Sequence, residues 1–238
     1  MTTGYAHWPG YGPRFAPPTG LASTLSVLGA VCIGAHALLA ALAVALLRVD
    51  APATAALTPP AVSGFAAMGR PMASPLVAAL LLTSLLLLLA ALALVLLHVV
   101  AGVVFLFWFA RVRRNAGILH PAAPHRHSPG AAIGGWFVPV LNLWLPKRVT
   151  DDIWRAGRPT VSRRLVDAWW AVSLGTLASG VTTLAVPHHL PWFLVTEVLA
   201  VGAGVLTLVL VWRLTFRQNA DHAAATTTFA YQNASVGM

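Results

Sequence analysis

The sequence has very few charged residues: Asp, Glu, Lys and Arg together make up 9% of its 238 residues. Because soluble domains have about a quarter of their residues charged, a soluble globular fold is excluded as a first interpretation. Hydrophobic residues make up 58% of the chain, and the mean hydropathy is +0.77. These residues gather in long uncharged runs, so the composition predicts an integral membrane protein.

Cysteine is nearly absent, and the one that is present, Cys32, lies inside an apolar run. The chain therefore forms no internal disulfide and offers no thiolate metal site. We interpret Cys32 as a small buried apolar residue.

The sequence also lacks the short motifs of common soluble enzymes: there is no HExxH, no Walker loop and no GxSxG. The triplet His125-Arg126-His127 has no acidic or Cys ligand nearby, so it is only a weak candidate for a metal site. We therefore expect a non-enzymatic protein with no catalytic residue, no metal and no cofactor.

Acidic residues are scarce beside basic ones, and the formal net charge is +9. Ten of the fifteen basic residues lie between Arg111 and Arg164, flanked by apolar runs. This distribution is typical of a cytoplasmic loop that faces anionic lipid headgroups, rather than of a nucleic-acid-binding surface. We expect the loop 111–165 to be cytoplasmic and expect no nucleic-acid partner.

Four apolar runs are each long enough to form a transmembrane helix. We predict an all-α integral membrane four-helix bundle, made of two helical hairpins within residues 21–220. With the basic loop inside, both termini are cytoplasmic in the cell membrane, and the tails 1–20 and 221–238 are expected to be disordered. The predicted spans are residues 21–47, 76–110, 166–186 and 192–212.

The segment 131–146 is apolar but broken by Gly134-Gly135, Pro139 and Pro146. It is shorter than the roughly 20 residues of a crossing, and a crossing would place one of its two basic flanks outside. We therefore predict a re-entrant or interfacial segment at the inner face, with a fifth crossing as the alternative.

An amphipathic helix is predicted to follow this segment, with Asn142 as its N-cap and Pro146 in the first turn. Val149, Ile153 and Trp154 share one face of it. On the polar side Lys147, Asp151 and Arg155 are spaced for ion pairs at i,i+4.

The ends of the second and fourth spans resemble each other. At an offset of 104 residues the pattern W-x4-R-x-N-A occurs in FWFARVRRNAG (107–117) and in VWRLTFRQNAD (211–221). Two hairpins related by an internal repeat would explain the pattern. Convergence would also explain it, since Trp and Arg both favour an inner membrane interface.

Three stretches carry a resemblance to a known family: RVRRNAGIL (111–119), HSPGAAIGGWFVPVLNLWLPKRVTDDIWRA (127–156) and DAWW (167–170). Over roughly residues 75–220 the chain resembles the actinobacterial membrane family catalogued as domain of unknown function 4328. The resemblance implies four helices, a basic central loop and a Gly/Pro-rich tail, and it implies no activity. Lys147 stands where that family often has an aromatic residue.

Three ionisable residues lie inside the predicted spans: His36, His98 and Glu197. The two histidines sit at depths that could match, so they could ligate a haem or relay protons, or each could bond a neighbouring backbone or hydroxyl group. Burying the Glu197 carboxylate in a membrane costs free energy unless the group is paired or solvated. His188 and His189 are its candidate partners in the sequence.

The first functional hypothesis is a scaffold or regulator whose inner face binds anionic lipid headgroups, a cytoplasmic protein or a second copy of the chain. The alternatives are a small transporter or channel built from the two hairpins, and a haem-binding redox protein. The inner face is predicted to comprise Arg111, Arg113, Arg114, Asn115, Trp136, Pro139, Asn142, Trp144, Arg148, Asp151, Trp154, Arg155, Arg217 and Asn219.

Overall fold

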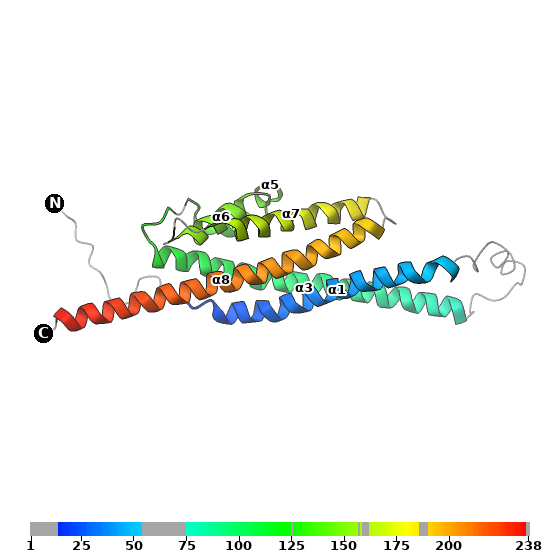
Figure 1. Ribbon diagram of the computed structural model, residues 1–238, viewed down its shortest axis with the longest axis horizontal. Coiled ribbons are helices and arrows are strands. Elements are labelled where there is room, and N and C mark those ends of the chain that lie inside the picture. The colour runs from blue at the N-terminus through cyan, green and yellow to red at the C-terminus, as the bar shows by residue number, and fades with distance from the viewer. Residues whose placement is uncertain are drawn as a thin grey trace, which may run out of the picture. The chain divides into compact units, whose positions relative to one another are not determined.

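The computed structural model describes residues 14–53, 75–124, 126–156, 158, 162–185 and 190–236, and every regular element in them is a helix (Figure 1). The predicted all-α class is confirmed. The helices are α1 (Thr19–Ala53), α3 (Pro75–Leu119), α4 (Pro129–Gly134), α5 (Pro139–Asn142), α6 (Leu145–Arg155), α7 (Arg164–Ala185) and α8 (Leu190–Val236).

Three of these helices contain stretches long and apolar enough to cross a membrane: Thr19–Ala45, Ser84–Leu119 and Pro191–Thr228. Such helices are apolar on all sides, as expected where lipid rather than water surrounds them. The chain is therefore a multi-pass membrane protein. Helix α7 coincides with the predicted third span but is not among the three, because five Ser and Thr residues and two glycines lower its hydropathy.

The chain divides into two compact units. We call the first the tryptophan unit, since it holds most of the tryptophans; it comprises Met1–Thr24, Val104–Trp170 and Leu208–Met238. The second, the span unit, comprises Leu25–Val103 and Ala171–Thr207.

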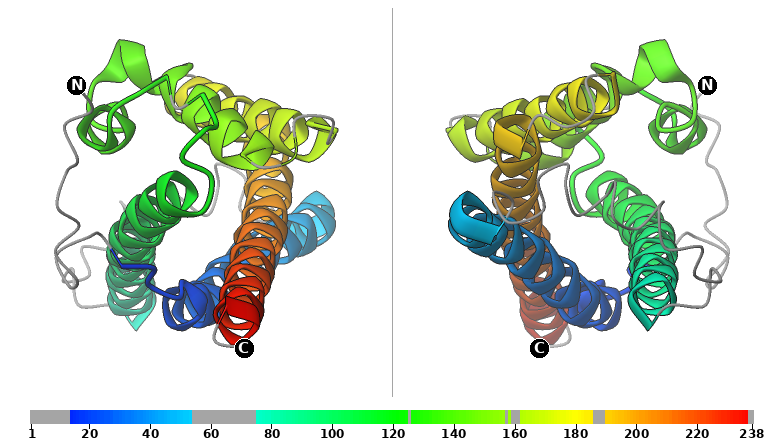
Figure 2. Two further views of the ribbon diagram at one scale, coloured as in Figure 1. Left: turned by 90° about the vertical axis from the view of Figure 1, so that its left-hand side faces the viewer. Right: turned by 90° about the vertical axis from the view of Figure 1, so that its right-hand side faces the viewer.

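In the span unit α8 contacts both α7 and α1 through glycines. A Cβ atom at Gly202 would lie 3.5 Å from Val172, and one at Gly204 would lie only 2.7 Å from Ile33 Cγ1. Small residues allow such close approach between membrane helices. Figure 2, which looks along the long helices, shows α1 (blue) and α7 (yellow) lying against α8 (orange).

In the tryptophan unit the core is aromatic and aliphatic. Trp108, Phe109 and Val112 from α3 are buried together with the apolar face of α6. That face was predicted as Val149, Ile153 and Trp154, and burial of all three confirms it. The side chains on the other side of α6 are polar, so the helix is amphipathic as expected.

The broken segment 131–146 folds as two short helices and the start of a third. Pro139 and Pro146 each stand in the first turn of a helix, where a missing N–H is harmless, as predicted for Pro146. The prediction that Asn142 caps the amphipathic helix is wrong. Because Pro139 already starts α5, Asn142 is helical, and α6 begins after Trp144 with no side-chain cap.

Several helices run further than predicted. Helix α3 continues to Leu119, so the first part of the predicted loop 111–165 is helical, and it ends two residues before Pro121, which cannot continue a helix. Helix α8 continues to Val236 through the predicted disordered tail 221–238, where alanines favour helix. Residues 14–18 of the predicted N-terminal tail pack against α3, while residues 1–13 lie outside the described part.

Candidate functional site

The tryptophan unit contains a polar cleft of about 500 Å³ beside α6. Its walls come from the polar face of α6, from the segment before α4 and from the residues that precede α7. The residues that line it are Arg126, His127, Trp144, Lys147, Arg148, Asp151, Asp152, Arg155 and Arg163. We call this cavity the basic cleft.

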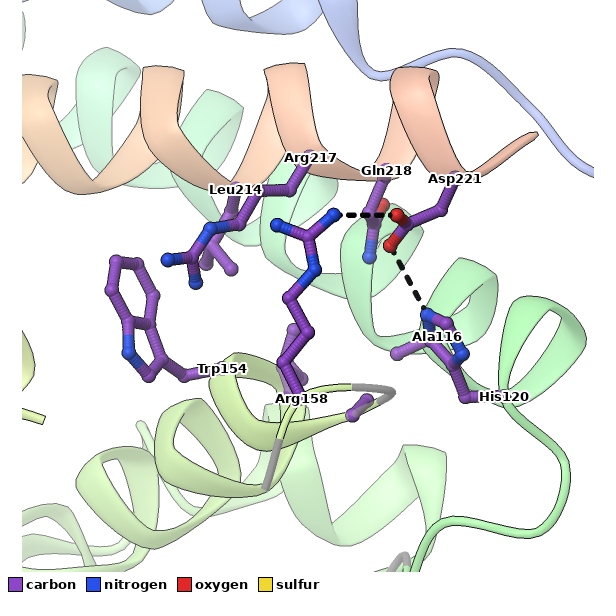
Figure 3. Close-up of a pocket in the computed structure, with 10 residues that line it drawn as sticks. Ala116, His120, Trp154, Arg158, Leu214, Arg217, Gln218 and Asp221 are labelled. Atoms are coloured by element: carbon purple, nitrogen blue, oxygen red, sulfur yellow. Dashed lines mark hydrogen bonds and ion pairs between the residues drawn. The ribbon is translucent and has the colours of Figure 1, made fainter. Parts of the chain in front are cut away.

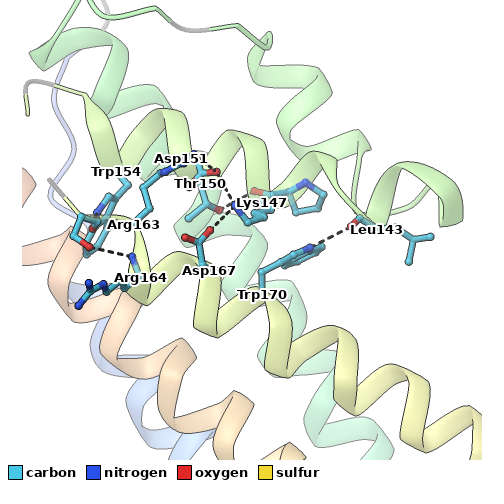
Figure 4. Close-up of polar contacts among 11 residues, drawn as sticks. Leu143, Lys147, Thr150, Asp151, Trp154, Arg163, Arg164, Asp167 and Trp170 are labelled. Carbon is cyan, nitrogen blue, oxygen red and sulfur yellow. Dashed lines mark hydrogen bonds and ion pairs between the residues drawn. The ribbon is translucent and has the colours of Figure 1, made fainter. Parts of the chain in front are cut away.

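Lys147 and Asp151 tie one wall of the basic cleft to helix α7. The Lys147 Nζ atom is 2.9 Å from Asp151 Oδ2 and 2.7 Å from Asp167 Oδ1 (Figure 4). Burial alone would lower the pKa of Lys147, but the hydrogen bonds to Asp167 and Asp151 outweigh burial and raise it. Arg163 lies 3.8 Å from the same Asp151 oxygen, so these contacts hold the wall in place.

Of the two i,i+4 pairs that the sequence predicts, the pair of Lys147 with Asp151 is confirmed. No ion pair between Asp151 and Arg155 is present in the described residues; Arg155 instead reaches the basic cleft with an exposed side chain. An exposed guanidinium in this position can contact a ligand in the cleft.

An aromatic ring stands at the rim of the basic cleft. Trp144 is 39% exposed, and the Arg148 guanidinium lies 4.6 Å from its ring centroid. A tryptophan beside arginines is typical of proteins that meet the headgroup region of a membrane.

The charge in the basic cleft is strongly unbalanced. Five of the lining side chains are Lys or Arg and two are Asp, which leaves three positive charges unbalanced when His127 is neutral. Ligand pockets commonly measure about 300–1,000 Å³, so the volume suits a small anionic group. Arginines in such a place recognise carboxylate and phosphate oxygens.

The cleft holds four of the residues predicted for the inner face: Trp144, Arg148, Asp151 and Arg155. Sequence reasoning missed the others. Arg126 and His127 reach the cleft because Arg113 Nη2 donates a 2.7 Å hydrogen bond to the His127 carbonyl oxygen, which anchors their segment to α3. No spacing signal links these distant residues.

Other predicted face residues turn inward and have structural roles. Asn115 is fully buried: its Nδ2 donates to the Ala16 carbonyl at 2.8 Å, and its Oδ1 accepts from the Ala16 N–H at 3.2 Å. Arg111 Nη1 donates to the Pro17 carbonyl, whereas Arg114 is exposed. The end of α3 thus anchors the N-terminal segment.

Arg217 also faces inward. Its guanidinium lies 3.9 Å from the Trp154 ring centroid, a cation–π contact between α8 and α6. Beside it, Asp221 pairs with Arg158 at 2.9 Å and with His120 at 3.2 Å (Figure 3). The cavity among these side chains measures about 20 Å³, room for a single water molecule.

The remaining predicted face residues are spread over different environments. Trp136 lies against Phe105, Phe109 and Trp170 with ring centroids 5.3–6.3 Å apart, so it belongs to the aromatic core. Pro139 is exposed, and Asn142 is half-buried. The fourteen predicted residues therefore do not form one continuous binding face.

The two copies of W-x4-R-x-N-A lie in the tryptophan unit, with different contacts. Trp108 Nε1 donates to Thr215 Oγ1 at 3.1 Å, whereas Trp212 stacks on Phe216. Asn115 is fully bonded, whereas the Oδ1 atom of Asn219 is buried with no hydrogen-bond partner in the described residues. The common pattern therefore serves two different environments.

The three intramembrane candidates meet in the span unit. His36 Nδ1 lies 2.6 Å from Glu197 Oε2, and His36 Nε2 lies 3.2 Å from His98 Nε2. The partner of Glu197 is thus His36, while His188 and His189 lie outside the described residues.

This arrangement does not fit a haem. A metal–nitrogen bond is about 2 Å long, so iron between two axial imidazoles would hold the nitrogens about 4 Å apart with the porphyrin between them. Here the two rings are in direct contact. Within the part of the chain that the structure describes, no three His, Cys, Asp or Glu side chains are grouped to hold a metal ion.

Comparison with known proteins gives one match. The model of a family described as a domain of unknown function (DUF4328) matches residues 75–216, which is more than half of the chain. No curated protein and no solved structure matches the sequence.

Proposed function

Because this chain belongs to the DUF4328 family, whose description assigns no activity, we propose a function from its own geometry. The protein is a multi-pass membrane protein that binds the headgroups of anionic lipids in the basic cleft, without catalysing a reaction. The observation that carries this proposal is the cleft of about 500 Å³ with five Lys and Arg side chains and a tryptophan at its rim.

Helix α7 is the fourth span in this proposal. Trp154 in α6 contacts Arg217 in α8, so both must lie on one side of the membrane. Along the chain, the apolar part of α8 lies between Trp154 and Arg217 and crosses the membrane once. A second crossing between the same two residues must therefore bring the chain back to the first side. The 22 residues of α7 extend about 33 Å at 1.5 Å per residue, enough for that crossing.

The basic cleft and both ends of the chain then lie on the cytoplasmic side. The segment from Arg111 to Arg164 holds ten of the fifteen basic residues, and such segments stay inside. The cytoplasmic leaflet carries the anionic lipids that attract them. A headgroup phosphate would meet Arg126, Arg148 and Arg155, whose side chains line the cleft.

The proposal is tested by binding of dihexanoyl phosphatidylglycerol to the full-length protein in detergent. Each arginine near an anionic surface contributes about 1 kcal/mol. Neutralising three of them in Arg126→Gln/Arg148→Gln/Arg155→Gln should therefore weaken binding about a hundredfold. Dihexanoyl phosphatidylcholine, which has no net charge, should bind weakly to both proteins.

A matched control removes the same charge elsewhere. Arg14, Arg114 and Arg213 are exposed and do not line the cleft. The variant Arg14→Gln/Arg114→Gln/Arg213→Gln should bind phosphatidylglycerol nearly as well as the wild type. Equal weakening in both triple variants would show general charge attraction and would refute a site in the cleft.

A further inference from the structure

Ionisable side chains are almost absent from the apolar helices. Residues 19–47 hold Cys32 and His36, residues 76–110 hold only His98, residues 168–185 hold none, and residues 190–212 hold only Glu197. Three of these four groups, one from each of three helices, meet in the span unit. Intramembrane ionisable groups are costly, so their convergence indicates a function.

The three side chains form a line of hydrogen bonds. Glu197 Oε2 lies 2.6 Å from His36 Nδ1, His36 Nε2 lies 3.2 Å from His98 Nε2, and His98 Nδ1 lies 2.8 Å from the Leu94 carbonyl oxygen. Both nitrogens of each imidazole are thus engaged. Cys32 stands one helical turn before His36 and has no place in this line.

The positions of the protons follow from this geometry. A carbonyl oxygen can only accept, so His98 Nδ1 carries a proton that it donates to Leu94. Between the two Nε2 atoms there is room for one proton, and between His36 Nδ1 and Glu197 for one more. The line therefore holds a fixed number of protons and carries no net charge.

Three arrangements share that proton count. In the first, Glu197 is protonated and both histidines are neutral. In the second, the Glu197 proton has moved to His36 Nδ1, which makes His36 an imidazolium beside a carboxylate. In the third, the proton on His36 Nε2 has moved to His98 Nε2, which leaves His36 neutral and His98 charged.

Each change breaks one O–H or N–H bond and forms one N–H bond across an existing hydrogen bond, without any side chain moving. We propose that Glu197, His36 and His98 are a proton relay inside the membrane, with H⁺ as the transported species. From the third arrangement, His98 releases one of its two ring protons to water and the Glu197 carboxylate takes up another proton, which restores the proton count. His36 accepts on Nδ1 and donates from Nε2, and both imidazole rings turn over before the next transfer.

Burial decreases along the line from Glu197 to His98. The Glu197 side chain is 7% exposed and that of His36 is 16% exposed, whereas His98 is exposed at the surface of the chain. Glu197 lies six residues after Pro191 and His36 nine residues before Ala45. At 1.5 Å per residue, these positions are about 9 and 14 Å from the ends of their apolar stretches, and His98, 14 residues after Ser84, is about 21 Å from the start of its stretch.

The experiment measures proton entry into liposomes that contain the full-length protein and trapped pyranine, driven by a valinomycin-imposed potassium diffusion potential. Glu197→Gln is the most informative variant, because the glutamine amide can still donate to His36 Nδ1 but carries no transferable proton. His36→Gln and His98→Gln interrupt the line at the other two positions. Cys32→Ser, on the same helix as His36, is the matched control.

The relay predicts that the wild type and Cys32→Ser conduct protons at equal rates above empty liposomes. It predicts that Glu197→Gln, His36→Gln and His98→Gln fall to the rate of empty liposomes while their melting temperatures stay close to that of the wild type. If the cluster only held the helices together, the substitutions would lower the melting temperature, and the wild type would show no proton flux above empty liposomes. A wild type with no flux above empty liposomes, or a Glu197→Gln variant with wild-type flux, would overturn the relay.

Discussion

Asn115 joins three parts of the tryptophan unit, so its replacement gives a sharp test of the packing at the end of α3. Its Nδ2 donates to the Ala16 carbonyl at 2.8 Å and to Gln218 Oε1 at 3.3 Å, and its Oδ1 accepts from the Ala16 N–H at 3.2 Å. Asn115→Ala removes all three hydrogen bonds at a site with no exposed surface.

The expected loss is about 2–4 kcal/mol, since each hydrogen bond contributes about 1 kcal/mol net and a buried group left unpaired costs more. Gln218 contributes most to this loss, because its side chain stays buried after its partner is gone. For a chain of this size about 1 kcal/mol corresponds to roughly 2–4 °C, so the melting temperature should fall by roughly 4–16 °C.

Two assays in detergent measure this effect. Intrinsic tryptophan fluorescence follows thermal unfolding, and trypsin cleavage after Arg14 reports release of the N-terminal segment from α3. Both the drop in melting temperature and the faster cleavage should appear in Asn115→Ala.

The second copy of the W-x4-R-x-N-A pattern supplies the control. Asn219 holds the equivalent position, but its Oδ1 atom has no hydrogen-bond partner in the described residues. Asn219→Ala should therefore change stability by less than about 1 kcal/mol. If both alanine variants lost the same stability, or if Asn115→Ala lost none, the assignment of Asn115 as the link between these segments would be refuted.

Two further predictions concern the helices of the membrane domain. Gly204→Ala should destabilise the protein by about 1–3 kcal/mol, because the new Cβ would lie 2.7 Å from Ile33 Cγ1. The control Gly34→Ala places its Cβ in open space and should not destabilise the protein. Thermal unfolding compares the melting temperatures of the two variants. In a Cys32→Ser background, His120→Cys, Ser162→Cys and Thr228→Cys should all react with an impermeant maleimide applied to the same side of the membrane. Reaction of Thr228→Cys from the opposite side would show that α7 does not cross.

Much of the architecture follows from local properties of the sequence. Apolar runs longer than the hydrocarbon thickness predicted the three helical stretches that are long and apolar enough to cross a membrane. The spacing of Val149, Ile153 and Trp154 predicted the buried face of α6, and the prolines marked where the short helices begin. These features depend on residues that are near each other in the chain, so periodicity and composition are enough to find them.

The ends of the helices were harder to predict. Charged and polar residues after Ala110 and after Trp212 marked the edge of the bilayer, but the helices continue beyond that edge to Leu119 and Val236. A change of solvent does not end a helix when the backbone can keep its own hydrogen bonds. Hydropathy therefore located the apolar stretches and left the helix ends open.

The sequence by itself determined that this chain is a membrane protein, which stretches are apolar enough to span the membrane, and which segment holds most of the basic residues. Only the tertiary structure decided which polar groups meet. Glu197 pairs with His36, 161 residues away, and two asparagines of one motif have opposite surroundings. The physical reason is that a hydrogen bond needs a partner within about 3 Å, and distant parts of the chain supply that partner only after the helices have packed.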